Sequence, residues 1–173
     1  MRMKLALCFA GLLVMLAAAQ QTQPDVDWKP LAWLVGDWTA MGSGGPGQGT
    51  GDSSFQLDLQ NKVLIRRSFA EYPATADKQA YRHDDLMVVY PEGKGFQAIY
   101  FDSEKHIIRY AVEISSDTKT VTFVSDTAPA APRFRLTYYK TDDTTLSGKF
   151  EIALPEKSFA TYLEWTAKKK IAK

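Results

Sequence analysis

Ten short runs of residues typical of β-strands follow one another along the chain, and turn residues separate them. The runs are rich in Val, Ile, Thr, Phe and Tyr, which favour strands, and almost no stretch shows the periodicity of an amphipathic helix. Their expected extents are Leu34–Met41, Ser54–Leu59, Val63–Tyr72, Asp84–Tyr90, Phe96–Asp102, Ile107–Ser115, Thr120–Ser125, Arg133–Lys140, Thr145–Leu154 and Ala160–Ala167. Because closing a sheet on itself removes its exposed edges, the pattern predicts an all-β fold, a ten-stranded antiparallel up-and-down barrel.

Apolar and polar residues alternate in several of these runs, so one face of each strand is predicted to point into the barrel. Ile108, Tyr110 and Val112, for example, share a face opposite Arg109 and Glu113. The aromatic residues assigned to the inner face, and hence to the walls of a ligand cup, are Tyr110, Phe123, Phe134, Tyr138, Phe150 and Trp165.

The start of the chain has the pattern of a secretory leader. Arg2 and Lys4 precede an apolar run from Leu5 to Ala18, and small residues follow up to Ala19. This predicts a signal peptide over residues 1–19 and export to the periplasm or beyond. The apolar run is shorter than the roughly 20 residues that span a bilayer, so no stable membrane insertion is expected.

The remaining chain divides by composition. Residues 20–27 are expected to be a flexible mature N-terminus, 28–168 the β-barrel, and 169–173 a basic tail. The single cysteine, Cys8, lies in the predicted leader, so the body has no disulfide and no cysteine nucleophile. With 21 Lys and Arg residues against 20 Asp and Glu residues, the chain lacks the basic excess of a nucleic-acid-binding protein.

The connections between runs differ in length in an alternating way. Neighbouring antiparallel strands reverse direction, so alternate connections lie at the same end of a barrel. Short turns gather at one end, and the other end collects Gly42–Ser53, Pro73–His83, Ser103–His106, Asp126–Pro132 and Pro155–Phe159. Binding elements tend to lie on loops carried by a rigid scaffold, so the second end is the predicted mouth, with the glycine-rich first loop as a flexible lid.

A short motif, Gly36-Asp37-Trp38, follows a helical turn predicted over Asp25–Leu34 that plugs one end of the barrel. With the glycine-rich first loop and the ten strands, this G-x-W motif resembles the calycin superfamily of lipocalins and fatty-acid-binding proteins. The segment from Leu31 to Trp38 is similar to the opening of bacterial lipocalin-like proteins of unknown function and, more distantly, of nitrobindin-type heme barrels. The resemblance implies that Trp38, with Gly36 before it, packs across the closed base.

The chain departs from these families at two positions. Lipocalins place an arginine near the last strand against the motif tryptophan, whereas only lysines follow Trp165 here. Nitrobindin-type barrels bind heme through a late histidine, whereas the last histidine here is His106. We therefore expect no heme and no other cofactor.

Two adjacent arginines, Arg66 and Arg67, lie within one predicted strand. Adjacent strand residues point to opposite faces, so one guanidinium must face inward, where it needs a partner such as Glu71, a tyrosine or a ligand carboxylate. Fatty-acid-binding proteins anchor a carboxylate with arginine and tyrosine, so the resemblance implies an anionic amphiphile in the cup. An internal Arg–Glu pair without a ligand is the alternative.

Both histidines and several carboxylates fall at the predicted mouth, and the candidates for chemistry there are His83, Asp85, Asp102 and His106. Imidazole and carboxylate groups can bind a divalent metal or act as an acid and base, but they also occur in a hydrated rim of turn residues. Because nothing in their spacing dictates ligand geometry, we expect no metal. The leading hypothesis is a binding protein for a small apolar or amphipathic ligand, rather than an enzyme that uses this cluster.

The segments 84–90 and 96–102 are apolar on both faces. With Glu92-Gly93 as the hairpin turn, Met87, Val89, Phe96 and Tyr100 are assigned to the outside. A shift of one residue would exchange the faces and still leave an apolar outer patch. Such a patch suggests a homodimer, and a dimeric interaction module without a small ligand is the third hypothesis.

Overall fold

The computed structural model describes residues 26–44, 49–127 and 130–171. A six-residue 3₁₀ helix, η1 (Lys29–Leu34), precedes ten strands in these residues. The strands are β1 (Gly36–Gly44), β2 (Thr50–Asp58), β3 (Val63–Tyr72), β4 (Tyr81–Glu92), β5 (Gly95–Asp102), β6 (Ile107–Ile114), β7 (Thr120–Ser125), β8 (Arg133–Lys140), β9 (Thr145–Ala153) and β10 (Ala160–Lys169). The predicted all-β class and the strand number are confirmed.

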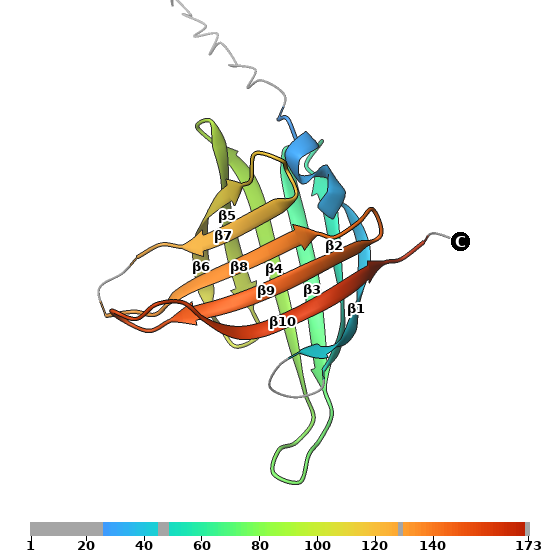
Figure 1. The fold of residues 1–173 in the computed structure, drawn as a ribbon, viewed down its shortest axis with the longest axis vertical. Coiled ribbons are helices and arrows are strands. Elements are labelled where there is room, and N and C mark those ends of the chain that lie inside the picture. The colour runs from blue at the N-terminus through green and yellow to red at the C-terminus, as the bar shows by residue number, and fades with distance from the viewer. Residues whose placement is uncertain (1–25, 45–48, 128–129, 172–173) are drawn as a thin grey trace, which may run out of the picture.

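The strands form one closed barrel in which each strand pairs with its sequence neighbours and β10 returns to pair with β1. Every pairing is antiparallel, as the up-and-down order requires, and η1 covers one end of the barrel (Figure 1). Among the described residues, no helix has the length and apolar character that a membrane crossing needs.

Strand pairing extends into two of the connections predicted to be long. β2 already begins at Thr50, opposite Glu71, and the β3–β4 hairpin continues until Tyr72 faces Tyr81. This hairpin projects beyond the rest of the barrel at the end away from η1 (Figure 1). The rest of the predicted lid, residues 45–48, lies outside the described residues, as do the predicted leader 1–19 and the following residues 20–25.

Trp38 lies at the closed end, almost fully buried, and its indole Nε1 donates a hydrogen bond to the Leu34 carbonyl at 2.8 Å. The Lys169 ammonium lies 5.2 Å from the Trp38 ring centre, so a lysine takes the place against the motif tryptophan where lipocalins have an arginine. Gly36 has a φ of +131°, and a Cβ there would come within 2.5 Å of the Lys169 side chain. The motif glycine thus makes room for this contact.

The β4–β5 hairpin corrects the sequence-based assignment of faces. Met87 and Val89 are fully buried inside the barrel, and Tyr100, which pairs with Met87, faces inward with them. Phe96 packs at the closed end against Trp28, with ring centres 5.0 Å apart. The prediction that these four residues face outward is therefore wrong. Both faces of the hairpin are apolar, so the alternation of residue types could not show which face points outward.

The outer face of the same hairpin carries the other apolar set. Leu86 pairs with Phe101 and Val88 pairs with Ile99. All four are at least partly exposed. An apolar outer patch thus exists, with different members, and a homodimer through it remains a prediction.

Trp165 of β10 reaches across the inner surface of β9 where Gly148 stands directly opposite it. A Cβ on Gly148 would lie 2.1 Å from the indole ring, so the ring rests on bare backbone. Its other side meets Tyr138 edge-on at 5.9 Å. A large aromatic that covers a strand glycine is a known way to stabilise a curved sheet.

We expect Gly148→Ala to lower the free energy of unfolding by about 1–3 kcal/mol, because the new methyl group overpacks a site that Trp165 already fills. Urea titration followed by tryptophan fluorescence measures this. Gly95→Ala is the matched control, since a Cβ there meets nothing within 4 Å. Equal effects of the two substitutions would contradict the packing argument.

Candidate functional site

The barrel encloses a cavity of about 530 Å³ that extends to the end away from η1. Apolar walls come from Trp165 and from Phe134 and Phe150, whose rings stack at 6.0 Å. Tyr72 and Tyr81, from the projecting hairpin, lie at its outer end and stack at 4.5 Å. A volume of this size is typical of small-molecule sites, and we call this cavity the cup.

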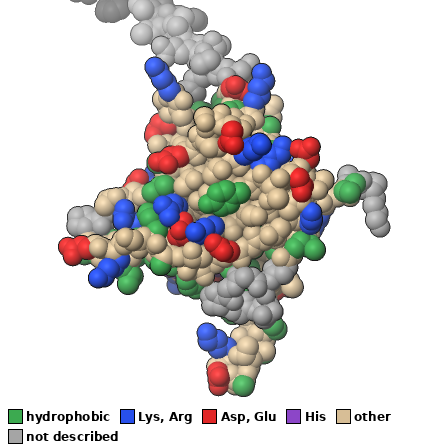
Figure 2. Space-filling model, in the orientation of Figure 1, with side chains coloured by type: hydrophobic (Ala, Val, Ile, Leu, Met, Phe, Trp, Pro, Cys, Tyr) green, Lys and Arg blue, Asp and Glu red, His purple; other side chains and the backbone are tan. Residues whose placement is uncertain are grey.

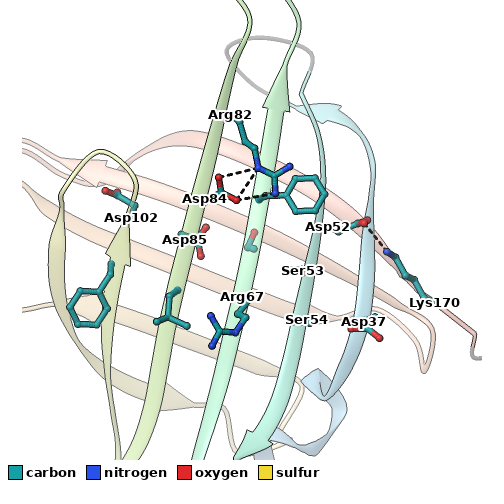
Figure 3. Close-up of a pocket in the computed structure, with 14 residues that line it drawn as sticks. Asp37, Asp52, Ser53, Ser54, Arg67, Arg82, Asp84, Asp85, Asp102 and Lys170 are labelled. Atoms are coloured by element: carbon teal, nitrogen blue, oxygen red, sulfur yellow. Dashed lines mark hydrogen bonds and ion pairs between the residues drawn. The ribbon is translucent and has the colours of Figure 1, made fainter.

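A second hollow, of about 500 Å³, lies over β1–β5 and is broadly open to solvent (Figure 3). Four of its charged residues form two ion pairs with one another. Arg82 bonds to Asp84 at 2.9 Å, and Lys170 bonds to Asp52 at 2.7 Å. Charges of both signs are likewise interspersed on the face formed by β8–β10 (Figure 2). Exposed ion pairs of this kind contribute little free energy and are common on protein surfaces without a ligand. The cup is therefore the stronger candidate site.

Of the two adjacent arginines, Arg66 points inward and Arg67 is exposed on the outer face, where it borders the second hollow. The expectation of one inward arginine is met, but Arg67 lies outside the cup. Phe123 also does not line the cup, since it is packed between Tyr110 and Tyr138, with both pairs of ring centres 6.2 Å apart.

Arg66 forms an ion pair with Asp85 of β4 inside the barrel, with Nη1 and Oδ1 3.0 Å apart. Arg66 is 7% exposed, and the side chain of Asp85 is 5% exposed. Burial opposes the charged form of Arg66, but the Asp85 carboxylate and the nearby Tyr138, Tyr100 and Tyr110 together outweigh it and raise the pKa of Arg66. Glu71, one of the partners expected from the sequence, instead bonds to Arg82 outside the cup.

His83 connects this buried pair to the mouth. Its Nε2 lies 3.1 Å from the Tyr100 hydroxyl and 3.6 Å from Asp85 Oδ2, and its Nδ1 lies 2.7 Å from Glu104 Oε2. The nearby Asp85 and Glu104 carboxylates raise the pKa of His83 despite its burial. A protonated His83 can donate to carboxylates on both sides.

Asp102 and His106 form a second imidazole–carboxylate pair beside the first. Asp102 stands opposite Asp85 in the β4–β5 ladder. It accepts a 2.9 Å hydrogen bond from the His106 backbone and lies 2.8 Å from the His106 ring. Burial opposes ionisation of Asp102, but these bonds hold its pKa below the ordinary value. All four residues assigned to the mouth cluster therefore meet at one site.

Glu104 and Tyr100 belong to this cluster as well. One ligand atom each of His83, Asp102 and Glu104 lies within 4.8 Å of the others, an arrangement that could accept a divalent cation after a small movement. Tyr100 was assigned to the outer face, and its strand carried no sequence signal for the opposite choice. In the sequence, Glu104 lies in a short turn next to His106, and this position was the indication that it belongs to the cluster.

Three buried polar atoms at the cup have no hydrogen-bond partner among the described residues: Arg66 Nε, the Tyr138 hydroxyl, and Asp85 Oδ1, whose contact is the ion pair with Arg66 Nη1. Tyr138 is 2% exposed. Burial raises the pKa of Tyr138 to about 12, so its hydroxyl is neutral and able to donate. Unsatisfied buried polar atoms are rare in folded proteins, and a bound molecule is one way to satisfy them.

No protein-family model matches the chain, and no curated protein matches it. Among solved structures, the chain is similar to the crystal structure of Rv2717c from M. tuberculosis, with a TM-score of 0.58 and 14% sequence identity. The similarity covers 83% of this chain and 97% of that chain. It shows a shared fold.

We expect Arg66→Met to lower the free energy of unfolding by about 3–5 kcal/mol, because it leaves the Asp85 carboxylate buried without a countercharge. The double variant Arg66→Met/Asp85→Leu should recover much of that loss. Lys170→Met, which breaks an exposed pair with Asp52, is the control and should change stability by at most about 1 kcal/mol. Chemical denaturation measures all three. A single-variant loss no larger than that of the control would contradict the buried-pair argument.

The raised pKa of His83 predicts a pH dependence of stability. Its protonated form is favoured by folding, so its contribution is complete below the ordinary value of 6.5 and is lost as the pH rises through the higher folded value. The stability difference between the wild type and His83→Gln should therefore shrink between about pH 5.5 and about pH 8.5. Denaturation at both pH values measures it, and a difference that grows with pH would contradict the assignment.

Proposed function

We propose that this protein binds one small, mostly apolar molecule inside the barrel, in the manner of a lipocalin-like carrier. The observation that carries the proposal is a cup of about 530 Å³ in which Arg66 Nε and the Tyr138 hydroxyl are buried without hydrogen-bond partners in the described part of the chain. The apolar walls would supply affinity, and the polar atoms would orient the molecule.

The energetic argument starts from the cost of the present arrangement. A buried hydroxyl or N–H without a partner costs about 1–3 kcal/mol. A ligand with one polar group near Tyr138 would offset that cost while its carbon skeleton covers Phe134, Phe150 and Trp165. Each aromatic wall of this kind contributes a large apolar contact area.

Heme fits this cup poorly. His83, which lines it, has both ring nitrogens in contacts, Nδ1 2.7 Å from Glu104 and Nε2 3.1 Å from the Tyr100 hydroxyl, so coordination of iron by His83 would break one of them. His106 is exposed at the mouth rather than among the apolar walls. The proposed ligand is therefore an organic molecule, held without a cofactor.

The proposed setting is outside the cytoplasm. Residues 1–19 have the charged start, apolar stretch and small residues of a secretory leader. A barrel without cysteine in its body needs no oxidative folding there, because closure and burial alone stabilise it.

We expect the uncharged fluorophore N-phenyl-1-naphthylamine to bind saturably to one site and to fluoresce more strongly there, since the cup excludes water. Leu163→Trp, which places a larger side chain on the wall of the cup, should abolish this binding. Glu164→Trp is the matched control, because Glu164 is the next residue in β10 and is exposed. Fluorescence titration of the three proteins measures the effect. If wild type and Leu163→Trp bound the fluorophore equally, the proposed binding site would be wrong.

A further inference from the structure

Charge is distributed unevenly around the cup. Among the described residues, its lining includes four carboxylates, Asp52, Asp85, Asp102 and Glu104, and one guanidinium, that of Arg66, with no lysine. Arg66 neutralises Asp85, and Lys170, from outside the cup, neutralises Asp52. Among the described residues, the close counterparts of Asp102 and Glu104 are His106 and His83. A protonated His83 supplies one positive charge to Asp85 and Glu104 together, so the four carboxylates still outnumber Arg66, Lys170 and His83.

From this imbalance we propose that the molecule bound in the cup is an amphipathic amine, with its ammonium group beside Glu104 and Asp102 and its apolar part among the aromatic walls. The inference rests on the proposed binding function and names the chemical class of the ligand.

The buried ion pair argues against the opposite charge. A ligand carboxylate could reach Arg66 only by sharing its guanidinium with Asp85, whose Oδ1 lies 3.0 Å from Nη1. Two carboxylates that close repel, and one of them would have to be protonated. An anionic amphiphile, which the resemblance to fatty-acid-binding proteins implied, is therefore disfavoured by the residues actually present.

The aromatic rings at the mouth favour a cation as well. Tyr72 and Tyr81 stack at its outer end, and Tyr100 lies next to His83. The faces of such rings attract ammonium groups, most strongly where water is partly excluded. The mouth thus offers both carboxylate oxygens and ring faces to a positive charge.

An independent sign that a molecule belongs here comes from the floor of the cup. Within the described residues, the Tyr138 hydroxyl and Arg66 Nε are buried without a hydrogen-bond partner. Neither belongs to the acidic group at the mouth. Both can donate a hydrogen bond, so an acceptor atom at the inner end of the amine, away from its ammonium group, would satisfy them.

Three ligands with one tail test the proposal: decylammonium, decanoate and decanol, titrated by calorimetry at neutral pH below their micelle concentrations. We expect decylammonium to bind at least about tenfold more tightly than decanoate, since its ammonium group can donate charge-assisted hydrogen bonds to the carboxylates at the mouth. Glu104→Gln should weaken decylammonium binding about tenfold and leave decanol unchanged. Glu92→Gln, which alters an exposed carboxylate in the turn region of β4, is the control.

The outcomes separate this inference from the binding function. If decanol and decanoate bind as tightly as decylammonium, the cup binds ligands but does not select an amine, and the inference is wrong. If N-phenyl-1-naphthylamine and all three ligands fail to bind, the proposed function is wrong as well. If Zn²⁺ binds in a Glu104-dependent way and decylammonium does not, the mouth is a metal site, and the amine inference is overturned.

Discussion

A guanidinium and a carboxylate meet inside the barrel, and the polar chemistry of the cup depends on their pairing. Without Asp85, a buried Arg66 would attract any anion that entered. With Asp85 at 3.0 Å, the floor is close to neutral, and each group offsets the cost of burying the other. The pair also places a carboxylate oxygen next to His83, which extends the network to Glu104 at the mouth.

The barrel leaves room for this network because of its strand number. The diameter of a barrel grows with the number of strands, and ten strands enclose more space than side chains fill. The closed end is filled by Trp38 and by η1, so the free volume lies toward the other end. Gly148 serves the same purpose locally, since its missing side chain lets Trp165 lie against the wall rather than across the cup.

The sequence predicts the architecture well because each strand is a local pattern. Residues 63–72, 120–125 and 133–140 were assigned to strands with the limits that the structure shows. The side-chain contacts inside the cup were less predictable, because the pairing between strands determines which residues lie next to each other. That Arg66 meets Asp85 depends on the register of the β3–β4 ladder, where Ser68 faces Asp85. The inward direction of Tyr100 depends on β4, whose two apolar faces carry no signal.

The order of charges along the cup also fixes how a ligand would lie in it. An ammonium group at the depth of Tyr138 would lose its hydration, and the nearest carboxylate there, that of Asp85, is already paired with Arg66. No new ion pair would offset the cost of desolvating the ammonium group. At the mouth, Glu104 and His106 are exposed, and a charged head there keeps part of its hydration. The apolar part of the ligand then lies along the aromatic walls, where burial of carbon is most favourable, and an acceptor atom at its inner end would satisfy the Tyr138 hydroxyl. The same ion pair that neutralises the floor therefore gives the ligand its orientation.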